Sequence, residues 1–250
     1  SSRRFTTNQN YLARYETKFG EDHSLMAMVG YEQYKLTESS LSAYNDHLFN
    51  PYIAELGNAH GTSQKDLGSS STHYMTEGIL SQVQYDYKDA WFLSGSYRRD
   101  ASSCFAPGHR WGLFPAYSLG WRVSEESFIK DNFDFVDNLK LRWSDGMTGS
   151  TQGSAYAYVA GYTKSGSWIL NEGATTNGWN SNTVENTILS WADVRMQDFG
   201  IDWELWRGKF GGSFDWFRRS TTGIAGSQTV SLPDFYGVSL PQMNLNANEN

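Results

Sequence analysis

The chain has 250 residues, enough for one or two domains, and its formal net charge at pH 7 is −7. This negative balance disfavours a nucleic-acid-binding protein, which would carry a basic stripe. No apolar run approaches the ~20 residues that a membrane-spanning helix requires, which excludes a helical membrane protein. A membrane β-barrel stays possible, because alternating strands never produce such runs. The single cysteine, Cys104, excludes an intramolecular disulfide framework, and we interpret it as a tolerated free thiol in a loop.

Segments with alternating apolar and polar side chains follow one another along the chain. A strand turns its side chains to opposite faces at successive residues, so this alternation predicts β-strands. Most of the segments are longer than the ~5–6 residues usual in soluble sheets. About eight strands are expected on this criterion, at residues 10–19, 23–35, 74–87, 91–100, 116–122, 139–146, 194–206 and 210–217.

The hairpin within residues 91–122 shows the pattern most clearly. One face carries Trp91, Leu93 and Tyr97 from the first arm and Leu119 and Trp121 from the second. The other face carries small or charged side chains. In a membrane barrel the aromatic face meets lipid and the polar face lines the lumen, whereas in a soluble sandwich the polar face meets water.

The connections between the expected strands alternate in length. Short turns followed by long loops are the rule in outer-membrane barrels, whereas long structureless loops count against a compact soluble domain. The sequence therefore favours an all-β, antiparallel, up-and-down transmembrane β-barrel. A soluble all-β protein, such as a carbohydrate-binding module, is the alternative. The short turns are expected at 20–22, 88–90 and 207–209, the long links at 36–73, 149–193 and from 223 onward, and a periplasmic helical turn within 125–135.

Three stretches resemble one known family. Residues 98–122 resemble the signature RRDGSSRFAPGNRWGxFPSxSxGWR, residues 136–149 resemble LKLRxSYGxTGN, and residues 199–217 resemble the hairpin NxGLDxxxxxxRLxGSxDYY. These are motifs of the SusC/RagA-like TonB-dependent outer-membrane transporters of Bacteroidetes, and the resemblance runs over most of residues 8–225. Asp145 departs from the family, which has a lipid-facing Tyr there. We expect it near the extracellular rim, because a carboxylate at the bilayer midplane is costly.

The resemblance implies a 22-stranded barrel in the cell outer membrane with a plug inside it. It also implies four partners: TonB, a SusD-like lipoprotein, outer-membrane lipid, and an oligosaccharide or peptide substrate. On this basis residues 1–250 are expected to be an interior part of the barrel domain, without the plug and the terminal strands. A passive porin or adhesin is a weaker alternative. No enzymatic activity, cofactor or metal site is expected, because the five histidines are far apart in sequence and no catalytic motif is present.

Two groups of side chains are candidate functional residues. Aromatic rings in the segment 154–179 suit stacking on sugar rings, although packing of the loop on itself or on a lid protein is the favoured interpretation. Charged residues at period two suggest paired glycosidase carboxylates, but a polar lumen wall with a ladder of charges across neighbouring strands is the better interpretation. The candidate substrate-binding aromatics are Tyr156, Tyr158, Tyr162, Trp168 and Trp179, and the candidate lumen-lining residues are Arg98, Asp100, Arg142, Asp198, Asp202 and Glu204.

Overall fold

The computed structural model describes residues 1–44, 66–153, 158–170, 174–181, 184–228 and 240–249, and a few single positions or pairs between these ranges. Nine strands form one sheet in the order β1-β2-β3-β4-β5-β6-β9-β10-β11, and β7 and β8 form a separate hairpin. All pairs are antiparallel. The strands are β1 (Ser2–Phe19), β2 (His23–Tyr44), β3 (Asp66–Tyr87), β4 (Trp91–Ser102), β5 (Trp111–Arg122), β6 (Val136–Ser150), β7 (Thr163–Leu170), β8 (Ala174–Asn180), β9 (Ala192–Leu205), β10 (Phe210–Gly226) and β11 (Met243–Glu249).

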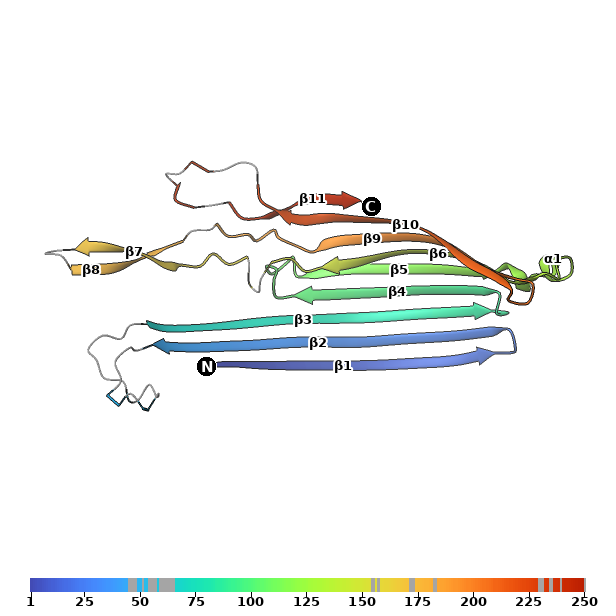
Figure 1. Cartoon of the computed structure of the whole chain (residues 1–250), viewed down its shortest axis with the longest axis horizontal. Coiled ribbons are helices and arrows are strands. Elements are labelled where there is room, and N and C mark those ends of the chain that lie inside the picture. The colour runs from blue at the N-terminus through green and yellow to red at the C-terminus, as the bar shows by residue number, and fades with distance from the viewer. Residues whose placement is uncertain are drawn as a thin grey trace.

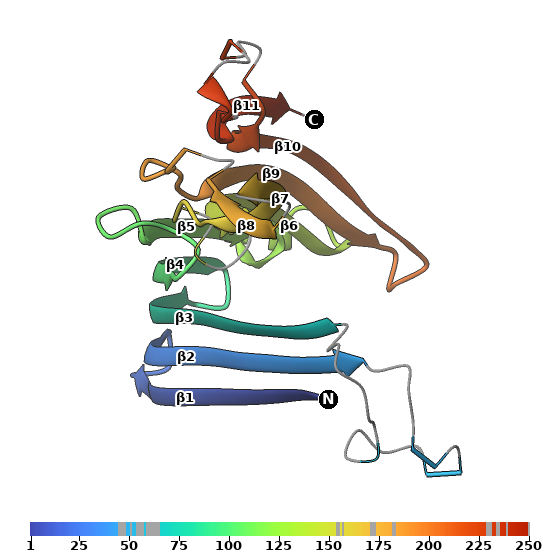
Figure 2. The same ribbon diagram turned by 90° about the vertical axis from the view of Figure 1, so that its left-hand side faces the viewer.

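The sheet confirms the all-β, up-and-down architecture expected from the alternation. Sequential strands lie side by side in one layer, with the short turns at one end and the long connections at the other (Figure 1). The two edge strands, β1 and β11, do not pair with each other, so the sheet is open. It is one twisted layer, which Figure 2 shows from its end.

Three of the expected loops contain strands. β2 and β3 extend far into the expected link 36–73, β7 and β8 lie within 149–193, and β11 lies beyond 223. These added parts are rich in Ser, Thr, Asn and Gly, so they lack the apolar alternation that revealed the other strands. Their backbone pairing, rather than a buried apolar face, makes them strands.

The register keeps the aromatic and polar faces separate from strand to strand. Trp91 pairs with Trp121 and Leu93 with Leu119, so the two arms of this hairpin present one shared apolar face. Neither that face nor its continuation on other strands is covered by a second sheet within the described ranges. The side chains of this outward band are exposed or half-buried; members include Tyr11, Tyr15, Leu25, Val29, Val83, Tyr85, Leu93, Tyr117, Leu119, Trp121, Leu141, Trp143, Phe199, Ile201, Trp203, Phe214 and Trp216.

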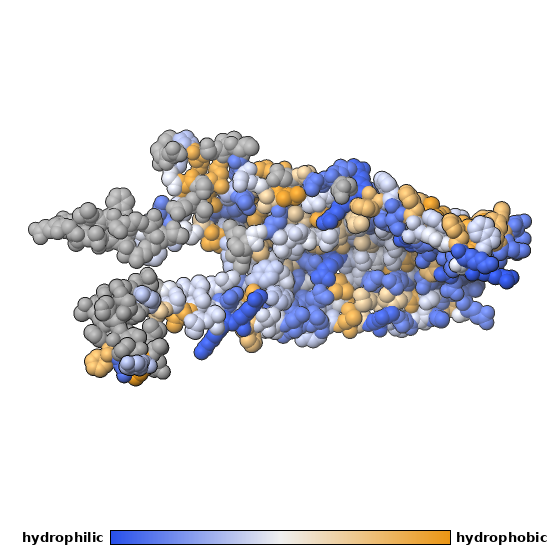
Figure 3. Space-filling model, in the orientation of Figure 1, coloured by the Kyte–Doolittle hydropathy of each residue, from blue (hydrophilic) through white to orange (hydrophobic). Residues whose placement is uncertain are grey.

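An aromatic cluster marks the end with the short turns. The rings of Trp91 and Trp121 stack with centroids 5.0 Å apart, and both indole N–H groups donate to Glu126 Oε1, at 3.2 and 3.0 Å. Glu126 directly precedes α1 (Ser127–Lys130), which confirms the helical turn expected within 125–135. Apolar and hydrophilic residues lie side by side at this end (Figure 3), the composition of a membrane–water boundary.

The tightest packing lies at the opposite end. The connection after β4 folds inward, so that Phe105 is 0% exposed and Cys104 is 2% exposed, both against Leu189. Cys104 does lie in a connection, as expected, but its thiol belongs to this small core. We refer to Cys104, Phe105, Leu189 and the rings packed against them as the extracellular core. None of the helices among the described residues is long and apolar enough to span a bilayer.

Candidate functional site

The inward face of β2–β4 carries a charge cluster built around Arg98. Its guanidinium donates to Glu32 at 2.9 Å and to Asp100 at 2.7 Å. Glu32 is on β2 and Arg98 is on β4, so the pair spans the intervening strand. Gly78 makes this possible, because a Cβ at that position would fall 2.2 Å from Asp100 Oδ1.

A second cluster of the same design lies on β6, β9 and β10. Arg142 donates two hydrogen bonds to Asp202, at 2.7 and 2.9 Å, and a third to Asp215 at 2.8 Å. The contact with Asp215 spans β9 at Gly200, where a Cβ would fall 2.5 Å from the Asp215 carboxylate. The two parallel hydrogen bonds of such a guanidinium–carboxylate pair fix the orientation of both side chains in addition to pairing their charges.

The expected charge ladder is therefore two separate clusters. Arg98 pairs with Asp100 on the same strand, and Arg142 pairs with Asp202 on the neighbouring strand, but no ion pair between described residues joins the two groups. Asp198 and Glu204 are on the same inward face, opposite Ser144 and Asn138 in the register, and enter neither cluster. The sequence analysis did not identify Glu32, Asp215 or the two glycines as parts of these clusters. Glycine inside a strand often marks a place where other groups approach closely, so the two glycines could have indicated the clusters.

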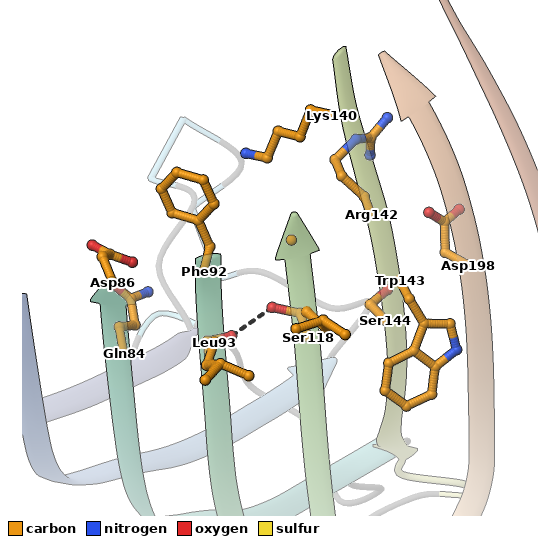
Figure 4. Close-up of a pocket in the computed structure, with 13 residues that line it drawn as sticks. Gln84, Asp86, Phe92, Leu93, Ser118, Lys140, Arg142, Trp143, Ser144 and Asp198 are labelled. Carbon is orange, nitrogen blue, oxygen red and sulfur yellow. Dashed lines mark hydrogen bonds between the residues drawn. The ribbon is translucent and has the colours of Figure 1, made fainter. Parts of the chain in front are cut away.

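Between the clusters the wall is hollowed over a volume of about 370 Å³ (Figure 4). The Lys140 amine lies 4.4 Å from the centroid of the Phe92 ring, and the Arg122 guanidinium lies 5.3 Å from it. The hydroxyls of Ser94 and Ser118 are 2.7 Å apart. Phenyl, hydroxyl and cationic groups in one hollow can contact a polar ligand or a polar polypeptide segment.

Asp145 faces outward, on the side of the apolar band. Arg195 donates to both of its oxygens, at 3.0 and 2.6 Å, and the Gln197 amide donates at 3.4 Å. Asp145 is nine residues above Val136, the first residue of β6. Asp145 therefore lies in the half of β6 nearer the long connections, where its charge is paired with Arg195.

Hydrogen bonds tie the extracellular core to distant segments. Trp191 packs its ring against Phe105, with centroids 5.3 Å apart, and its indole N–H donates to the Arg110 carbonyl at 2.8 Å. The Asn244 amide donates to the carbonyls of Gly223, at 2.6 Å, and Ser190, at 3.0 Å. The connection after β4, the approach to β9 and the end of β10 are thereby held together.

Four of the five candidate aromatics, Tyr156, Tyr158, Tyr162 and Trp179, have described side chains. Tyr158 belongs to the packing of the extracellular end, because its hydroxyl accepts a hydrogen bond from Arg110 at 3.3 Å and its ring lies 6.2 Å from that of Tyr156. Tyr162 and Trp179 are 74% and 69% exposed. The Trp168 backbone pairs with Thr176 in the β7–β8 hairpin, and its side chain lies outside the described residues.

Comparisons with known proteins agree with this geometry. No family model matches the chain. TonB-dependent receptor P39 of Formosa agariphila is 29% identical over 245 residues, which are 97% of this chain and 22% of that protein. TonB-dependent receptor SusC of Bacteroides thetaiotaomicron is 25% identical over 193 residues, 76% of this chain and 19% of that protein. Over most of its length the chain resembles the SusC/RagA-like TonB-dependent receptors.

Solved structures show the same fold. The RagAB peptide importer in its closed-closed state superposes with a TM-score of 0.83 and 20% identity, over 99% of this chain and 27% of that one. The chain thus has the fold of a part of an outer-membrane β-barrel. It spans about a quarter of the length of the relatives that it matches. Those relatives are named as receptors and importers, not as enzymes.

Proposed function

We propose that the full-length receptor imports oligosaccharides or peptides across the outer membrane, driven by TonB and assisted by a SusD-like lipoprotein. One observation carries the proposal: a single sheet that is apolar on one face, with nothing among the described residues covering it, and polar, charged and hollowed on the other. Lipid on the first face and a hydrophilic passage on the second account for both. A soluble carbohydrate-binding module would leave this apolar face in water, so the geometry does not support that alternative.

Uptake assays in the source organism test the proposal. Deletion of the receptor gene is expected to abolish uptake of labelled oligosaccharides or of labelled peptides, and deletion of the tonB gene is expected to abolish the same uptake. A SusD-like lipoprotein is expected to copurify with the tagged receptor in equal amounts. Uptake that survives loss of TonB would contradict energised import and favour a passive pore.

A further inference from the structure

Arg99 is a cation on the outward, apolar face of β4. It follows Tyr97 by two residues and its register partner on β5 is Leu113, so its side chain lies on the same face as theirs. The side chains of Tyr97 and Leu113 are exposed there, and Arg99 is exposed as well. The preceding residue, Arg98, points inward and belongs to the charge cluster with Glu32. The sheet therefore carries an arginine among side chains that face lipid.

This arginine differs from two others of the outward face. Arg195 on β9 pairs with Asp145 on β6, and Arg218 on β10 pairs with Glu249 on β11. None of the ion pairs between described residues includes Arg99. The positive charge of Arg99 is thus available to an anion from outside the described part of the chain.

The outward carboxylate next to Arg99 in the register is engaged elsewhere. Glu77 lies two residues along β3 from Ile79, the residue that pairs with Arg99. Its Oε2 accepts a hydrogen bond from the Tyr31 hydroxyl at 3.3 Å, on the side of β2 and away from β4. Diagonal neighbours in a sheet are ~7–8 Å apart, which is beyond the reach of an ion pair without a change of rotamer. Glu77 therefore does not neutralise Arg99.

An indole ring holds the Arg99 guanidinium in place. The guanidinium carbon lies 4.6 Å from the centroid of the Trp111 ring, at the start of β5. Such stacking occupies one face of the planar guanidinium and leaves the N–H donors along its edge available. The Trp111 side chain is itself exposed, so the stacked pair is open to the surroundings of the sheet.

The stacked pair lies toward the end of the sheet with the long connections. Arg99 is eight residues from Trp91, at the short-turn end of β4, and three residues from Ser102, at the other end. The exposed rings of Tyr97 and Tyr117 lie next to it on the same face, and tyrosine and tryptophan favour the membrane–water boundary. Lipid phosphate groups lie at that boundary, and a guanidinium binds a phosphate through two parallel hydrogen bonds.

We infer that Arg99, stacked on Trp111, binds the phosphate group of a membrane lipid. The guanidinium supplies the positive charge and the paired donors. The exposed side chains of Leu113 and Tyr97 contact the acyl chains below that headgroup. The inferred site is on the outward face, so it does not depend on which solute the receptor carries.

Lys35 on β2 provides a matched comparison on the same face. It is exposed, it pairs in register with Met75, and it enters none of the ion pairs between described residues. No cation–ring contact of Lys35 is present in the described part of the chain. Its ammonium also lacks the planar, paired donors of a guanidinium. A built site should depend on Arg99 alone, whereas general attraction of anionic lipid should depend on both cations.

Native mass spectrometry of the full-length receptor in detergent tests the inference. The probes are phosphatidic acid and diacylglycerol with the same acyl chains, which differ only in the phosphate. Phosphatidic acid is expected to bind more tightly, and Arg99→Gln is expected to weaken its binding about five-fold or more, the loss of a charge-assisted contact. Arg99→Lys keeps the charge and should have a smaller effect. Lys35→Gln is the control and is expected to leave the affinity unchanged.

Three results would overturn the lipid site. They are equal affinity for the two probes, unchanged affinity in Arg99→Gln, and equal losses in Arg99→Gln and Lys35→Gln, which would indicate general attraction. The first comparison uses the unaltered receptor, so it is decisive even if a variant folds poorly.

Discussion

The wall of β1–β4 and the extracellular core are stabilised in different ways. The wall is a ladder of backbone hydrogen bonds, in which β2 and β3 pair along 22 residues, and most of its side chains are exposed or half-buried. The core instead depends on a few buried rings held by hydrogen bonds between segments far apart in sequence. The wall should therefore tolerate most substitutions that respect the alternation, whereas the core should be sensitive to single changes.

Phe105→Ala gives the largest expected effect, because the ring is fully buried against Trp191. Removing such a ring costs about 3–5 kcal/mol. Amide hydrogen exchange should accelerate in residues 103–111 and 186–192 of the full-length receptor and stay unchanged in β1–β4. His109→Ala, an exposed residue of the same connection, is the control. Equal acceleration in the wall would show that the two regions are one cooperative unit.

Leu119→Arg is expected to have the second-largest effect, because it places a charge on the lipid-facing side of the sheet. Leu119 lies within the outward band, where an arginine near the midplane costs about 2–4 kcal/mol. The fraction of folded receptor in lipid vesicles during urea titration measures the loss. Ser118→Arg places the same charge on the adjacent inward-facing residue, so its effect should be small. Equal losses for both variants would contradict the assignment of the two faces.

Glu126→Ala is expected to have an intermediate effect at the end with the short turns. It removes the acceptor shared by Trp91 and Trp121, and charge-assisted hydrogen bonds are worth about 1–2 kcal/mol at a half-exposed site. Tryptophan fluorescence during the same urea titration reports the change. Glu125→Ala, its exposed neighbour, should leave the midpoint unchanged. A midpoint that moves equally in both variants argues for a general charge effect.

Gly200→Ala is expected to have the smallest effect. A Cβ there displaces Arg142 or Asp215, and breaking a partly exposed ion pair costs up to about 1 kcal/mol. Gly95→Ala is the control, because its nearest neighbour would lie 3.8 Å away. High salt should narrow the difference between the two variants, because screening weakens the pair in the parent protein. A salt-independent difference would point to steric strain instead.

The wall could be predicted from sequence because its determinants are local. Alternation of residues such as Leu93 and Ser94 reveals both the strand and its two faces, and short turns fix which strands pair. The same alternation placed Arg98, Asp100, Arg142 and Asp202 on the inward face, but it did not reveal which ion pairs they form. The contacts that Glu32 and Asp215 make across glycine positions could not be predicted either, because they join strands that are not neighbours.

The extracellular end could not be predicted in the same way. The contacts of Phe105 with Trp191, and of Arg110 with Tyr158, join segments tens of residues apart with no shared period. Tyr158 therefore looked like a free aromatic of a binding loop, although its hydroxyl is engaged in packing. The polar strands β7, β8 and β11 carry no apolar alternation, which is why they were expected to be loops.

Site-directed spin labelling of the full-length receptor in lipid vesicles tests the central claim most directly. Labels are placed one at a time along β5, from Ala116 to Trp121, and their collision rates with oxygen and with a water-soluble nickel complex are measured. The buried Cys104 is replaced by Ser in every variant. Oxygen contact is expected to peak at Tyr117, Leu119 and Trp121, and nickel contact at the residues between them. The same accessibility at every position would contradict a wall with lipid on one face and water on the other.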